Sequence, residues 1–138
     1  MTVVIFACVH NAGRSQMAAA FFGRLADPGR ARAISAGTAP AAAVHPEVVR
    51  AMGEVGIDLT RAAPTRLTEE LARGAQLLVT MGCGESCPLV PGLRRVDWAV
   101  ADPKGRPLDA VRAIRDDIRR RVAALVTAEG WRVSGAAS

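Results

Sequence analysis

The sequence predicts a single α/β domain with a four-stranded parallel sheet and helices on both faces. Two alternating patterns indicate this class. Short apolar runs are typical of buried strands, and the longer segments between them, whose apolar residues recur every three or four positions, are typical of helices. A third observation is a polar loop at residues 8–14 that joins the first apolar run to a helix. Strands that alternate with helices form parallel sheets, and such sheets bind ligands beyond the carboxyl ends of their strands.

Each expected element follows from its own pattern. The run AQLLVTM at 75–81 is unbroken, as in a strand buried on both faces, whereas the run LRRVDW is expected at an edge. The expected strands are 3–6, 31–36, 75–81 and 93–98. The expected helices are 15 or 16 to 26, 45–56, a short one capped by Thr68 or Thr65, and 108–129. We assign residues 1–130 to one domain and residues 131–138 to a frayed C-terminal tail.

The polar loop carries Cys8 at its head and Arg14 at its foot, with Asn11 and Gly13 between them. A loop that enters a helix points successive backbone N–H groups at one spot, where the helix dipole favours an anion. Arg14 adds a planar fork for two oxygens of a tetrahedral oxyanion. Cys8 is then expected beneath the central atom of that anion, as a thiolate nucleophile.

The residue after Arg14 completes the predicted site. Ser15 has the position expected for the N-cap of the following helix, and its hydroxyl is placed to donate a hydrogen bond to the Cys8 sulfur. A lone cysteine at a strand end is more often a small core residue, but the apolar strand before it and the Ala-rich helix after it favour the functional interpretation. The predicted oxyanion-binding residues are Val9, His10, Asn11, Ala12, Gly13, Arg14 and Ser15.

Two further loops are expected on the same rim of the sheet. Loop 82–91 carries Cys83 and Cys87, and loop 100–107 carries Asp102. The carboxyl ends of parallel strands meet at one edge, so both loops should approach the polar loop. This arrangement would bring together a nucleophile, an anion cradle, a candidate general acid and two more thiols.

Taken alone, the rim residues have simpler interpretations. An Asp-Pro pair such as 102–103 is typical of a plain turn. Cys83 and Cys87 would suit half of a zinc site, but His10 and His45 are the only candidates for the other half. We therefore expect neither a metal nor another cofactor.

The composition narrows the classes of function. The 138 residues suit one domain with one core, and no apolar run approaches the roughly 20 residues that cross a bilayer. We expect no membrane partner, a monomer, and a reducing cytoplasmic location for the three cysteines. The net charge is +5, but the arginines are spread along the chain and Tyr is absent, so we expect no nucleic acid. The arginines between 112 and 121 are expected on a solvated helix face.

Five segments resemble the low-molecular-weight protein tyrosine phosphatase family, and within it the arsenate reductases. They are CVHNAGRSQMA at 8–18, SAGT at 35–38, HPEVVRAMGEVGIDL at 45–59, VTMGC at 79–83 and DWAVADP at 97–103, in the family's order. Some relatives bind potassium with the loop Asn and an acid on the first helix. Ala19 and its neighbours offer no such acid, so we expect no potassium requirement.

The resemblance implies a relay of thiols. Cys8 would attack arsenate, Arg14 and the loop amides would hold the oxygens, and Asp102 would protonate the leaving oxygen. Cys83 would then attack Cys8 and release arsenite. Cys87 would free Cys8, and thioredoxin or a glutaredoxin-like protein would reduce the Cys83–Cys87 disulfide. The C-x3-C spacing is more compact than in the thioredoxin-coupled members we can compare.

Three other functions remain open at this point. An arsenate transferase would need only Cys8, because a small thiol such as mycothiol would attack the arseno-cysteine. A phosphotyrosine phosphatase would use Cys8, Arg14 and Asp102, with Trp98 as the candidate aromatic wall. An arsenite- or metal-sensing module would use the cysteines as ligands, and it would leave Arg14 and Asp102 without a role.

Overall fold

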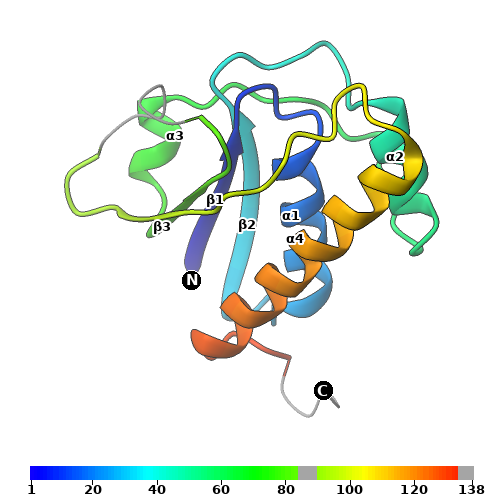
Figure 1. Cartoon of the computed structure of the whole chain (residues 1–138). Coiled ribbons are helices and arrows are strands. Elements are labelled where there is room, and N and C mark those ends of the chain that lie inside the picture. Colours follow the sequence, from blue (N-terminus) through cyan, green and yellow to red (C-terminus); the bar gives the residue numbers. More distant parts are fainter. Residues whose placement is uncertain (84–89, 134–138) are drawn as a thin grey trace.

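The computed structural model describes residues 1–83 and 90–133. Its elements are β1 (Thr2–Cys8), α1 (Arg14–Leu25), β2 (Ala31–Gly37), α2 (Pro46–Gly53), α3 (Glu69–Arg73), β3 (Leu77–Thr80), β4 (Arg94–Asp97) and α4 (Leu108–Ala128). The four strands form one parallel sheet in the order β2-β1-β3-β4 (Figure 1). The predicted fold class is confirmed, and β4 lies at the expected edge.

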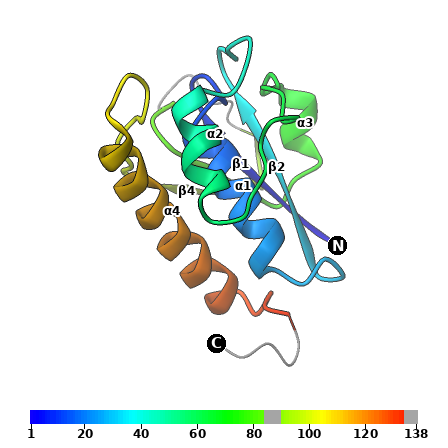
Figure 2. The same cartoon turned by 90° about the vertical axis from the view of Figure 1, so that its right-hand side faces the viewer.

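Helices cover both faces of the sheet, as predicted. Helices α1, α2 and α4 lie on one face and α3 lies on the other (Figure 1). Figure 2 shows α4 running along α1 on the more heavily covered face. None of the helices in the described part of the chain has the length and apolarity needed to cross a membrane.

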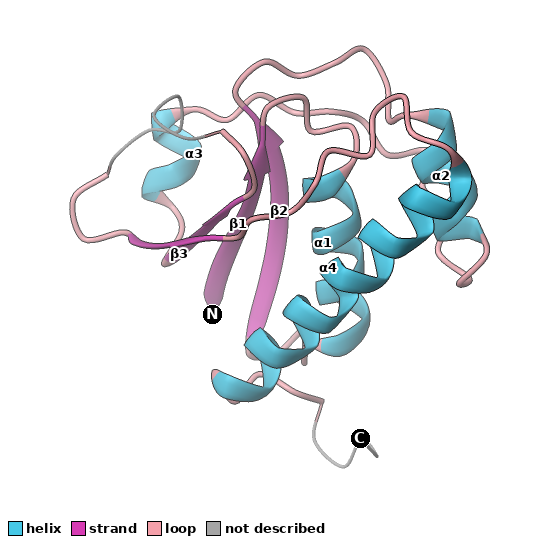
Figure 3. Ribbon diagram, in the orientation of Figure 1, coloured by secondary structure: helices cyan, strands magenta, loops and turns pink. Residues whose placement is uncertain are grey.

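Strand β1 is the centre of the core. Its residues 3–8 are all buried, because the strand pairs with β2 on one side and β3 on the other. The registers place Cys8 opposite Gly37, and Ala7 opposite Thr80. The carboxyl ends of these strands are therefore level, and the loops that follow them gather at one end of the molecule (Figure 3).

Helix α1 begins one or two residues earlier than predicted. Its N-cap is Gly13, which makes no side-chain capping bond, so the assignment of Ser15 as N-cap is wrong. Ser15 lies inside the first turn, where its hydroxyl contacts Asn11 and Cys8 instead. The predicted alternative for α3 is resolved in favour of Thr68, whose hydroxyl accepts from the Leu71 N–H at 3.0 Å.

The chain beyond α4 is held to the fold further than predicted. Trp131 was expected to fray, but its carbonyl accepts from the Asp27 N–H at 2.7 Å and its ring lies 5.8 Å from that of Phe22. Arg132 forms a bridge with Ala26. The apolar ring of Trp131 gains a partner on α1, which explains why the chain does not fray at this point.

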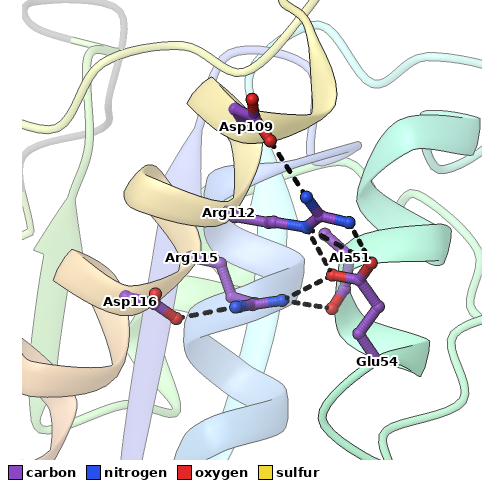
Figure 4. A network of polar contacts seen from close by, with 6 residues as sticks. All are labelled: Ala51, Glu54, Asp109, Arg112, Arg115 and Asp116. Atoms are coloured by element: carbon purple, nitrogen blue, oxygen red, sulfur yellow. Dashed lines mark hydrogen bonds and ion pairs between the residues drawn. The ribbon is translucent and has the colours of Figure 1, made fainter.

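The arginines of α4 do not all lie on a solvated face. Arg115 is buried, and its guanidinium donates to the Ala51 carbonyl at 2.8 Å and to Glu54 at 3.0 Å (Figure 4). Arg112 contacts the other carboxylate oxygen of Glu54 at 2.6 Å. Glu54, at the end of α2, therefore joins α2 to α4 through two arginines one turn apart.

This network predicts a loss of stability in acid. Hydrogen bonds from Arg112 lower the pKa of Glu54 to about 2, from an ordinary value of 4.5. A carboxylate whose pKa is lower in the folded than in the unfolded protein stabilises the fold at pH values above the unfolded pKa. This contribution disappears as the pH falls toward 2. Glu54→Gln should therefore lower the melting temperature at pH 7 and flatten its decline between pH 4.5 and pH 2.

The matched control for this experiment is Glu69→Gln. Glu69 forms one exposed ion pair with Arg73 inside α3, a type of pair that contributes little. Melting curves recorded across the pH range would contradict the prediction if the Glu54 and Glu69 variants behaved alike.

Candidate functional site

Four backbone carbonyls of the predicted oxyanion loop, those of Cys8, Val9, His10 and Ala12, face away from the loop. They accept hydrogen bonds from the segment 38–45, at distances of 3.2 Å for Cys8, 2.8 Å for Val9, 2.9 Å for His10 and 2.9 Å for Ala12. All described peptide bonds are trans, so the N–H that follows each of these carbonyls points the opposite way, into the loop. None of the N–H groups of residues 9–14 donates to another described group. The loop therefore encloses a set of unpaired amides, as an anion cradle requires.

Asn11 holds the sharpest bend of the loop. Its φ is 49°, which only a few residue types adopt readily, and its side chain is fully buried. Its Oδ1 accepts from the Thr65 N–H at 2.8 Å and from Gln16 Nε2 at 3.2 Å. Its Nδ2 donates to Ser15 Oγ at 2.7 Å. The side-chain amide thus ties the loop to α1 and to the segment around residue 65.

Asn11→Ala is expected to destabilise the protein by about 3 kcal/mol, because it removes three hydrogen bonds at a buried side chain and leaves the Thr65 N–H without its acceptor. Alanine also tolerates this φ poorly. The control is Asn11→Gly, which loses the same hydrogen bonds but accepts the φ. Urea unfolding would contradict the prediction if both variants were within about 0.5 kcal/mol of wild type.

Cys8 lies at the floor of the loop as a free, buried thiol at the end of β1. Its sulfur is 2.9 Å from Ser15 Oγ. That oxygen already accepts a hydrogen from Asn11, and no other acceptor for the Ser15 hydroxyl is found among the described residues. The hydroxyl is therefore oriented to donate to the sulfur, which suits an anionic nucleophile.

The rim loop at residues 100–107 contacts the guanidinium of Arg14 twice. Its Nη1 donates to the Val100 carbonyl at 3.2 Å, and its Nη2 lies 3.7 Å from the Asp102 carboxylate. The Arg14 side chain is only 10% exposed, whereas that of Asp102 is 45% exposed. The structure thus brings Cys8, Arg14 and Asp102 to one rim, as the sequence predicted.

Comparison with known proteins identifies the family. The low molecular weight phosphotyrosine protein phosphatase family matches residues 3–131. The chain belongs to this family. A relative from Halobacterium salinarum, provisionally named an arsenate reductase, is 40% identical over 121 residues, which are 85% of each chain.

Solved structures of the family place the chain beside arsenate reductases. The thioredoxin-dependent arsenate reductase of Corynebacterium glutamicum is 35% identical with a TM-score of 0.79, and the match covers 93% of this chain but 61% of that longer one. The arsenate reductase of Archaeoglobus fulgidus is 31% identical with a TM-score of 0.78, over 90% of this chain and 98% of the other.

The phosphatase-family loop also depends on residues that the sequence did not reveal. Gln16 and Thr65 support Asn11, and the Gln16 side chain further donates to the Ala63 carbonyl at 3.3 Å. Gln16 directly follows Arg14 and Ser15 in the sequence, and that proximity to the predicted site was the available signal for it. No signal marked Thr65, because it contributes a backbone N–H.

Three glycines allow the backbone to close around this site. A Cβ at Gly37 would lie 2.6 Å from the Val9 carbonyl, and one at Gly13 would lie 2.8 Å from Pro103 Cγ. A Cβ at Gly82 would lie 2.6 Å from Arg14 Nη1. The segments beside the loop therefore touch it with no room for a side chain.

The rim beyond β3 and β4 is fixed by one shared carboxylate. Thr80 donates to Asp97, and Arg95 Nε donates to the same Asp97 oxygen at 3.0 Å. These two donors hold the pKa of Asp97 below its ordinary value. The contact ties together the strand ends that lead to Gly82 and Val100.

The remaining predicted site residues differ in burial, and one of them is not described. Cys83 is buried next to Gly82, and Cys87 lies outside the described residues. His10 is half-buried, with its Nδ1 3.2 Å from the Ala39 carbonyl. Among the residues that the structure describes, no group of three or more His, Cys, Asp and Glu side chains could hold a metal ion.

Proposed function

We propose that the chain is an arsenate reductase that uses Cys8 as its nucleophile. The observation that carries the proposal is a free sulfur enclosed by inward-facing amides, with a guanidinium from the same loop and a carboxylate from another. The names of the relatives support the choice of arsenate. We assign the activity to residues 1–130, as a monomer in the reducing cytoplasm.

The first step forms a bond between sulfur and arsenic. The Cys8 thiolate attacks arsenic(V), and one arsenate oxygen leaves as water with a proton from Asp102. The loop amides and Arg14 hold the remaining oxygens. When the guanidinium turns to the anion, the Asp102 carboxyl is released from its ion pair with Arg14 and faces the leaving oxygen.

The second step reduces the arsenic. Cys83 attacks the Cys8 sulfur, the electron pair of the sulfur–arsenic bond passes to arsenic, and arsenite leaves as arsenic(III). Cys8 and Cys83 are then joined by a disulfide. Cys87 attacks Cys83 and restores the Cys8 thiolate, and thioredoxin reduces the Cys83–Cys87 disulfide. Two electrons thus pass from thioredoxin to arsenic in each cycle.

A phosphatase would use the same cradle and would also need a wall for its aromatic substrate. Trp98, the candidate wall, has its ring 5.8 Å from that of Phe6 and is partly buried against the core. A small, symmetrical anion needs no such wall. This position of Trp98 favours arsenate over phosphotyrosine.

The proposal is tested by supplying the wild-type protein with different reductants. Arsenate should drive oxidation of NADPH through thioredoxin reductase and thioredoxin, with one NADPH consumed for each arsenite formed. If only a small thiol such as mycothiol with a glutaredoxin-like protein supports turnover, the chain is an arsenate transferase. Hydrolysis of p-nitrophenyl phosphate without any arsenate reduction would refute the reductase and establish a phosphatase.

A further inference from the structure

The backbone of Gly82 packs against the guanidinium of Arg14, which binds the anion in the proposed function. It follows β3 by two residues, and its φ of +91° is a conformation that favours glycine. A Cβ built on it would lie 2.6 Å from Arg14 Nη1, 3.3 Å from Cζ and 3.4 Å from Nη2. The preceding residue is pinned to the central strand, because the Met81 N–H donates to the Ala7 carbonyl at 2.7 Å. The glycine backbone is therefore a fixed wall for Arg14.

Two further groups contact the Arg14 guanidinium. The Val100 carbonyl and the Asp102 carboxylate contact its Nη atoms, and Arg14 as a whole is 8% exposed. We propose that Gly82 is a positioning residue, whose missing side chain leaves the space in which Arg14 is held for oxyanion binding. This inference rests on the proposed function, and it adds a residue that acts through Arg14 and not on the anion itself.

The position of Gly82 also links the two halves of the proposed reaction. Cys83 follows it directly in the chain, so the backbone that supports Arg14 also carries the thiol that attacks Cys8. Gly82 therefore joins the wall of the anion-binding side chain to the proposed attacking thiol through a single peptide bond.

Gly82→Ala tests the inference by measuring the binding of inorganic phosphate, which occupies the cradle without being reduced. The colliding atoms are the far end of a flexible side chain, so the guanidinium should give way while the fold is kept. We expect the dissociation constant to rise about tenfold or more, as for the loss of a charge-assisted hydrogen bond. The matched control is Gly92→Ala, which has a φ of +82° but open space around the added Cβ. Its phosphate affinity should stay within about twofold of wild type.

A double variant distinguishes a steric effect on Arg14 from a general effect of the Gly82 substitution on the fold. Lysine lacks the guanidinium atoms that would meet the new methyl group, so Gly82→Ala should have little further effect on phosphate binding in an Arg14→Lys background. If Gly82→Ala alone prevents folding, Arg14→Lys should restore folding in the double variant. Equal effects of Gly82→Ala in both backgrounds, or wild-type affinity in the single variant, would overturn the inference alone. Failure of the wild type to bind phosphate would overturn the proposed function as well.

Discussion

Cys8→Ser is expected to abolish arsenate reduction with every reductant. A serine hydroxyl is a weak nucleophile at neutral pH, and its oxygen cannot pass through the disulfide states that carry the electrons to arsenic. We expect a loss of at least a thousandfold, as for other nucleophile replacements. Arsenite produced from arsenate, in the presence of thioredoxin or of a small thiol with a glutaredoxin-like protein, is the quantity to measure.

Phosphate binding is the control that shows the cradle is intact in this variant. The amides and Arg14 do not depend on the sulfur for their positions, because the loop is held by the segment 38–45 and by Asn11. The dissociation constant for phosphate should therefore stay within about tenfold of wild type. Arsenite production at more than a small fraction of the wild-type rate would show that another thiol is the nucleophile.

The sequence predicted the fold and the composition of the rim because both depend on short-range patterns. The apolar run of β1 and the alternation of strands with helices predicted a parallel sheet. Because the carboxyl ends of parallel strands meet at one edge, Cys8, Arg14 and Asp102 were expected close together. Ser15 was assigned wrongly as an N-cap because helix-start preferences are local. The predicted contact between its hydroxyl and the Cys8 sulfur is confirmed, whereas its contact with Asn11 depends on how the loop folds.

The supports of the site were beyond prediction for a related reason. Thr65 acts through a backbone N–H, and Gly37 and Gly82 act because they have no side chain where another segment comes close. In the sequence these residues look like ordinary turn residues. Their roles depend on a close approach to segments far away in the chain. Arg115 was likewise predicted on a solvated face, because its partners Ala51 and Glu54 lie on another helix.

Replacing each of the two cysteines between β3 and β4 by serine is expected to stop the reaction at a different step. Cys83→Ser should form the arseno-cysteine on Cys8 but release no arsenite, because Cys83 is the thiol that attacks Cys8 in the proposed relay. Cys87→Ser should release about one arsenite per enzyme molecule and then stop as a Cys8–Cys83 disulfide. Rapid-quench measurement of arsenite without an external reductant separates these outcomes, and mass spectrometry identifies the trapped disulfide.

Turnover with thioredoxin tests whether the third thiol, Cys87, is needed. Cys83 directly follows Gly82, whose backbone lies against the Arg14 guanidinium, so the proposed attacking thiol is one residue away from the wall of the anion site. A buried Cys8–Cys83 disulfide would be poorly accessible to a protein reductant, and Cys87 would carry the oxidising equivalents out of the cradle. Full multiple turnover of Cys87→Ser with thioredoxin would contradict the three-thiol relay. Turnover of both variants with a small thiol alone would instead mean that Cys8 is sufficient and that the chain transfers arsenate to that thiol.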